Sequence, residues 1–141
     1  NNIADQFSKY VFAEVVNADY VPYVLEFIKQ SYDNYKLFIS TGTPQNEIKK
    51  ILKLKKIAKY FNSVHGSPMS KTNHIKFICR HNNMKHDELI FFGDANSDLE
   101  AARENDIQFV LRLHKYNRKY FQNYSGKKIK TFKSSDILSL K

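Results

Sequence analysis

Two aspartates four residues apart, placed just after an apolar run, are the clearest chemical feature of the sequence. In LIFFGDANSDLEAA, four apolar residues lead into Gly93 and Asp94, and Asp98 follows. Carboxylates held this close repel each other unless a cation joins them, and Mg2+ accepts a few carboxylates together with water and phosphate oxygens. The pair therefore predicts a metal site, with Gly93 allowing a sharp turn. The alternative is structural: Asp98 favours a helix N-terminus and Asp94 caps a turn.

Two further polar loops carry groups that suit a phosphate. In TGTP, Thr41 offers a hydroxyl, Gly42 permits close approach of the backbone, and Pro44 is placed to open a helix whose first amides suit an anion. In GSPMSK, Lys71 offers an ammonium that would neutralise phosphate and hold the carboxylates in place. The alternatives are an ordinary strand-to-helix turn at Thr41 and a solvated side chain at Lys71.

Histidines and the cysteine give weaker signals. His65 and His74 lie near the Lys71 loop, but their spacing does not make a convincing metal site. Cys79 falls on an apolar helical stripe, which predicts a core thiol. We expect the other histidines on the surface: His81, His86 and His114.

The elements that would position these groups alternate between strand and helix, which predicts an α/β fold with a largely parallel sheet. In such sheets, ligands bind beyond the carboxyl ends of the strands, so the three loops should converge on one edge. Asn17 or Asp19 is a candidate cap for the first helix, with Pro22 in its first turn. The expected strands are 36–40, 63–65, 89–92 and 107–111, the expected helices follow residues 21, 44, 74 and 98, and a last strand and short helix lie within 129–140.

Composition limits the number of domains, the partners and the location that the sequence predicts. The length of 141 residues and a hydrophobic fraction of 42% suit one domain with a real core. The net charge of +9 attracts anions, and aromatics interleave with basic residues in HKYNRKYFQNY, but no nucleic-acid-binding motif accompanies them, so we expect solvated lysine-rich faces and no nucleic-acid partner. A single cysteine, no signal peptide at the start and no membrane-length apolar run predict a cytoplasmic protein without a membrane partner.

Taken together, the three loops resemble motifs of the haloacid dehalogenase-like (HAD) hydrolases, especially the phosphatases related to phosphoglycolate phosphatase. KLFISTGTP resembles the second motif of that family, with Thr41 in the phosphate-binding position. YFNSVHGSPMSK resembles the third, with Lys71 as the motif lysine, and FFGDANSDLEAARENDIQFV resembles the fourth, with Asp94 and Asp98 as the acidic pair. The resemblance covers residues 21–113.

The resemblance implies a Rossmann-like core and Mg2+-dependent hydrolysis of small phosphate monoesters through an aspartyl-phosphate. It implies catalytic roles for Lys71 and Asp94, phosphate binding by Thr41, Gly42 and Lys71, and metal binding by Asp94 and Asp98. Such covalent catalysis divides one difficult step into two, while metal and lysine offset charge on the transferring group. The implied partner is a small phosphorylated metabolite.

The nucleophile of the family's first motif, DxDGT, is not found in this sequence. The aspartates before Thr41 are Asp5, Asp19 and Asp33; none follows an apolar strand or has an Asp two residues later. Residues 1–17 resemble the end of a helical cap, and 18–141 an incomplete core. We therefore expect a truncated chain that is inactive by itself. The alternative is a non-catalytic module that binds phosphate or a phosphorylated ligand.

A missing first motif also predicts a missing central strand between 36–40 and 89–92. Buried unpaired backbone groups cost about 1–3 kcal/mol each, so an open slot should not persist. Either the two strands pair directly, or another chain fills the slot by strand addition; we favour the second, and hence a homo-oligomer.

Overall fold

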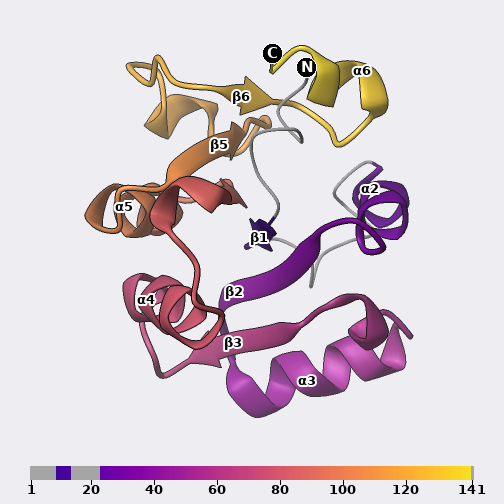
Figure 1. The fold of residues 1–141 in the computed structure, drawn as a ribbon. Coiled ribbons are helices and arrows are strands. Elements are labelled where there is room, and N and C mark those ends of the chain that lie inside the picture. The colour runs from indigo at the N-terminus through magenta and orange to yellow at the C-terminus, as the bar shows by residue number, and fades with distance from the viewer. Residues whose placement is uncertain (1–8, 14–22, 141) are drawn as a thin grey trace.

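A computed structural model of the chain describes residues 9–13 and 23–140. These residues form a parallel sheet with the strand order β3-β2-β1-β4-β5-β6 (Figure 1). The strands are β1 (Lys9–Phe12), β2 (Lys36–Pro44), β3 (Ser63–Ser67), β4 (Leu89–Gly93), β5 (Gln108–Arg112) and β6 (Lys128–Ile129). The helices are α2 (Val24–Ser31), α3 (Gln45–Leu54), α4 (Lys71–His81), α5 (Asn96–Glu104) and α6 (Ser134–Leu138), with single 3-10 turns at Ala58–Tyr60, His86–Glu88 and Arg118–Tyr120. The α/β class with flanking helices is confirmed.

Helices cover both faces of the sheet, which explains why its central strands are apolar throughout. Helices α4 and α5 lie on one side, and α2, α3 and α6 on the other (Figure 1). Along β1, Tyr10 and Phe12 pack in the core cluster that includes α2 and α3, whereas Val11 packs in the cluster that includes α4 and α5. Strands buried on both faces need apolar residues at every position.

The expectation of a missing central strand is wrong. Strand β1 lies between β2 and β4, parallel to both, with Phe12 in register with Ile39 on one side and Phe92 on the other. The slot is filled by the chain itself, so neither direct pairing of β2 with β4 nor a strand from a second chain is needed. Lys9–Phe12 are therefore not part of a helical cap remnant, and the rest of residues 1–17 lies outside the described residues.

The other elements lie close to their predicted positions. Helix α2 begins at Val24, and the predicted cap residues Asn17 and Asp19 and the first-turn Pro22 lie outside the described residues. Strand β2 continues through TGTP to Pro44, because Pro44 still pairs with Ser67 of β3, so this segment is not the predicted turn. Among the described residues, no helix is long and apolar enough to cross a membrane.

Candidate phosphate-binding site

The carboxyl ends of β2 and β4 and the start of α4 bring the three predicted loops to one edge of the sheet. Thr41 is a buried residue of β2, and its hydroxyl accepts a hydrogen bond from the Thr43 amide at 3.2 Å. Gly42 is exposed, and a Cβ added there would meet nothing within 4 Å. None of the described residues therefore crowds Gly42, and the close approach of its backbone to a ligand remains a prediction.

Asp98 is fully buried and is held by the loop around it. Its Oδ2 accepts hydrogen bonds from the amides of Asp94 at 3.1 Å and Ala95 at 3.0 Å. Its Oδ1 lies 2.7 Å from the Lys71 ammonium. A Cβ at Gly93 would come within 2.6 Å of this carboxylate, so glycine is required there to admit Asp98. Asp98 thus caps the start of α5, as the structural alternative predicted.

Lys71 is the first residue of α4 and is fixed at the site by two contacts. Its ammonium donates to Ser97 Oγ at 2.9 Å and pairs with Asp98. The side chain is 19% exposed, so the ammonium can still meet an anion from solvent. Burial raises the pKa of Asp98, and the positive charge of Lys71 opposes that rise. Lys71 therefore supplies the cation that pairs with Asp98 at the loop between β4 and α5, called the acidic loop below.

Asp94 has partners that sequence reasoning did not identify. Its Oδ2 accepts a hydrogen bond from His114 Nε2 at 3.0 Å. The His114 side chain is only 21% exposed, so its predicted surface position is wrong. Asn117 donates to the carbonyls of Asp94 and Arg112, both at 2.9 Å. His114 and Asn117 follow β5, and the rule that placed the other loops at this edge could have found them.

The residue that follows the central strand β1 is an alanine. Ala13 is buried, and its amide donates to the Phe92 carbonyl at 3.0 Å. A methyl group therefore stands at the end of the strand where the family's first motif has an aspartate. This agrees with the absence of that motif from the sequence. Glu14, which comes next, lies outside the described residues.

The acidic residues at this edge do not by themselves make a magnesium site. Among the described residues, no three His, Cys, Asp or Glu side chains are grouped so that they could hold a metal ion. Both Asp98 oxygens have partners in the loop and Lys71, and Asp94 Oδ2 is bonded to His114. Within the described part of the chain, this leaves Asp94 Oδ1 as the carboxylate oxygen without a partner, and one such oxygen is a poor donor set for Mg2+.

Behind the phosphate loops, a buried histidine joins β2, β3 and α4. The His74 ring is fully buried; its Nε2 donates to the Gly66 carbonyl at 2.9 Å, so its Nδ1 accepts from Ser40 Oγ at 2.7 Å. Burial lowers the pKa of His74 and so favours the neutral ring that these bonds require. His74 therefore positions the first turn of α4, which carries Lys71, against the strand that carries Thr41.

One cavity adjoins the site. It has a volume of about 520 Å³ and Asp94 forms part of its wall. Its other lining residues are Ala95, Asn96, His114, Tyr116, Asn117, Tyr120 and Phe121. This cavity, called the aromatic cavity below, lies between the acidic loop and the segment that follows β5, called the β5 loop.

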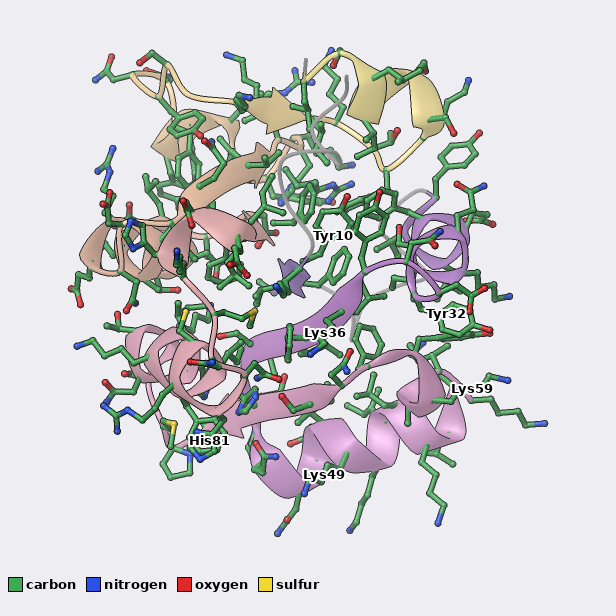
Figure 2. All side chains as sticks on the ribbon, in the orientation of Figure 1. Tyr10, Tyr32, Lys36, Lys49, Lys59 and His81 are labelled. Atoms are coloured by element: carbon green, nitrogen blue, oxygen red, sulfur yellow. The ribbon has the colours of Figure 1, made fainter. Side chains whose placement is uncertain are left out.

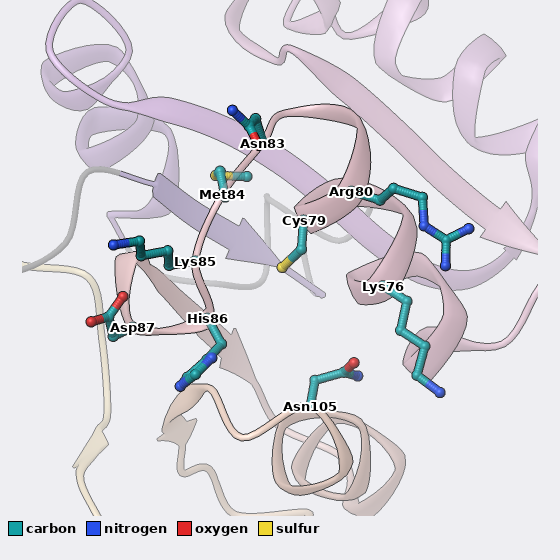
Figure 3. Close-up of a pocket in the computed structure, with 9 residues that line it drawn as sticks. All are labelled: Lys76, Cys79, Arg80, Asn83, Met84, Lys85, His86, Asp87 and Asn105. Carbon is teal, nitrogen blue, oxygen red and sulfur yellow. The ribbon is translucent and has the colours of Figure 1, made fainter.

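A second cavity, of about 640 Å³, lies at the opposite end of α4 (Figure 3). Its cations include Lys76 and Arg80 in the second half of α4, and basic groups near a helix C-terminus are favoured by the helix dipole alone. Cys79 borders this cavity, and burial raises the pKa of its thiol, which makes it a poor nucleophile. No residue of this cavity belongs to the candidate site.

Comparisons with known proteins agree with this arrangement. The family model described as haloacid dehalogenase-like hydrolase matches residues 2–112. The structure is similar to the core domain of a protein assigned as a phosphoglycolate phosphatase from Streptococcus pneumoniae TIGR4, with a TM-score of 0.72, 20% identity and coverage of 96% of this chain and 98% of that one. No curated protein matches the sequence.

Longer solved structures match as well. A haloacid dehalogenase-like family hydrolase from Streptococcus pneumoniae has a TM-score of 0.70 and 21% identity, over 84% of this chain and 58% of that one. A predicted phosphatase from Clostridium acetobutylicum has a TM-score of 0.65 and 21% identity, over 75% of this chain and 53% of that one. The chain thus spans a little more than half the length of these two proteins. With a family model that covers most of its length, the chain belongs to the haloacid dehalogenase-like hydrolases.

Proposed function

We propose that this chain binds small phosphate monoesters at the carboxyl edge of its sheet and does not hydrolyse them by itself. The observation that carries the proposal is that the site holds the Lys71 ammonium in place but has an alanine, Ala13, at the end of the central strand. The ammonium offers charge to a phosphate, whereas a methyl group cannot attack phosphorus. Thr41 and Gly42 complete the phosphate contacts, and the ligand is a phosphorylated metabolite of the cytoplasm.

Magnesium has a secondary place in this proposal. Asp94 would bind Mg2+ weakly, with Asp98 as support through the amides of the loop, because one free carboxylate oxygen is a small donor set. In a complete site of this family, the metal offsets negative charge on the phosphoryl group. The phosphate contacts of Thr41 and Lys71 do not depend on it.

Calorimetric titration with inorganic phosphate tests the binding part of the proposal. We expect Lys71→Ala and Thr41→Val each to weaken binding about tenfold or more, because each removes a donor or a charge from the anion. Lys76→Ala is the matched control, because Lys76 is also on α4 but lines the remote cavity. Absence of phosphate binding, or equal binding by all four proteins, would contradict the proposal.

Turnover of para-nitrophenyl phosphate tests the catalytic part. We expect none from the native chain with or without Mg2+. A variant with Ala13→Asp and Val15→Asp restores the DxD spacing of the first motif, and we expect it to gain Mg2+-dependent turnover that a further Asp94→Asn removes. Metal-dependent turnover by the native chain would show that another residue acts as the nucleophile.

A further inference from the structure

The aromatic cavity places exposed tyrosine rings next to the candidate phosphate site. Asp94 borders both, because its side chain lines the cavity while its amide bonds to Asp98, the partner of Lys71. A phosphate held between Thr41 and Lys71 therefore has this cavity beside it. The volume of about 520 Å³ falls within the range of small-molecule sites.

Four of the eight residues that line the cavity carry rings, namely His114, Tyr116, Tyr120 and Phe121. Tyr116 and Tyr120 are each 71% exposed, whereas Phe121 is buried. A Lys115 ammonium lies 4.9 Å from the Tyr116 ring centroid, and Lys119 lies 5.0 Å from that of Tyr120. Exposed rings of this kind offer flat faces to a flat ligand, and the lysines add positive charge near an anionic one.

The polar groups of the cavity divide into those already used and those still free to meet a ligand. Asn117 is fully engaged: its amide nitrogen donates to Asp94 and Arg112, and its oxygen accepts from the His114 amide at 2.7 Å. His114 is held in one tautomer, because Nε2 donates to Asp94 while Nδ1 accepts from the Tyr116 amide at 3.2 Å. These two residues hold the β5 loop in place. The exposed Asn96 can turn its amide to a ligand, since its present partner is the exposed Glu100 at 3.2 Å.

We propose that the aromatic cavity binds the organic group of the ligand and selects phosphate monoesters in which that group carries an aromatic ring, such as aryl phosphates and nucleoside monophosphates. This inference rests on the proposed phosphate binding and adds a specificity role for Tyr116 and Tyr120. The rings stack on the aromatic group, and Asn96 meets a polar edge where the ring has one. A saturated ring of the same size fills the same volume but lacks the flat face.

The test compares phenyl phosphate with cyclohexyl phosphate, which differ in the aromaticity of the ring, by calorimetric titration of the whole chain. We expect phenyl phosphate to bind at least about fivefold more tightly, since stacking of a ring on an aromatic side chain has an effect of this order or larger. Tyr116→Leu combined with Tyr120→Leu should abolish the preference and leave the affinity for inorganic phosphate unchanged. Both side chains are mostly exposed, so the double variant should fold, as circular dichroism can verify.

A matched control is Tyr32→Leu. Tyr32 is also exposed and follows α2 (Figure 2). Its ring contacts Tyr60, and it does not line the aromatic cavity. This variant should keep the preference. Equal binding of the two esters by the native chain, or a preference that survives in the double variant, overturns the inference. Absence of inorganic phosphate binding instead refutes the proposed function itself, and the inference with it.

Discussion

Asp94 and Asp98 look equivalent in the sequence, but their surroundings differ. Asp98 is fully buried, and its carboxylate bonds to two loop amides and to Lys71. Asp94 is partly exposed and borders a cavity. The spacing of four residues correctly predicted a carboxylate at the start of a helix, but it could not show which carboxylate the loop amides would take. Asp98 therefore holds the loop between β4 and α5 and orients Lys71, whereas Asp94 is the carboxylate that borders a cavity.

Loss of the Lys71 ammonium should destabilise the folded chain, because this ammonium pairs with the buried Asp98 carboxylate. Lys71→Met keeps the stem but leaves the buried Asp98 carboxylate without its ammonium, so we expect the free energy of unfolding to fall by about 2–4 kcal/mol at neutral pH. Adding Asp98→Asn to Lys71→Met should recover part of that loss, because the buried charge is gone. Urea denaturation of the three proteins measures the effect. A larger loss in the double variant than in Lys71→Met would show that the capping hydrogen bonds matter more than the charge.

At the scale of elements, the sequence predicted most of the sheet and missed its centre. β2 and β4 are recognisable as apolar runs followed by polar segments, and those segments carry residues of the candidate site. Lys9–Phe12 contain three apolar residues, but the segment is short and ends in Ala13 rather than an aspartate. Without an aspartate of the first motif after it, this segment was not recognised as the central strand. A signal was present nonetheless, because Tyr-Val-Phe is a run of large β-forming residues, as is the Ile-Phe-Phe of β4.

The contacts between β3 and α4 predict a loss of stability in mild acid. Burial, followed by the nearby His74 and His81, lowers the pKa of His65 on β3 to about 4, and burial also lowers that of His74 on α4. A lowered pKa means that the unfolded chain binds protons first as the pH falls, from the ordinary histidine value of 6.5 downwards. Stability should therefore be complete above about pH 6.5 and fall progressively towards pH 4.

Urea midpoints at pH 7 and pH 4.5 measure this effect. His65→Gln should reduce the difference between the two midpoints, because it removes one of the groups that titrate between the folded and unfolded states. His86→Gln is the control, since the His86 side chain is 60% exposed. A native protein whose midpoint is the same at both pH values would show that these histidines are protonated in the folded state.

At the scale of the whole molecule, β1 joins the two halves of the sheet. It pairs with β2 and β4 and contributes to the core on both faces of the sheet. The strands on either side of β1 come from later parts of the chain, so the two halves of the sheet are joined through a strand that lies near the N-terminus. A chain that lost this pairing would expose two inner sheet edges, each a template for association.

Val11→Asp tests that role directly. Val11 is fully buried in the cluster with α4 and α5, and an unpaired charge there should remove several kcal/mol from a total stability of about 5–15 kcal/mol. We expect the native chain to be a monomer of 16.6 kDa in light scattering with one cooperative unfolding transition, and the variant to lose that transition and associate. Gln108→Asp is the control, because it places the same charge in β5 at a half-buried position and should cost about 1 kcal/mol or less. If the native chain is a dimer that dissociates on Val11→Asp, β1 is exchanged between two chains. If the Val11→Asp variant is as stable as Gln108→Asp, the central strand is not Lys9–Phe12.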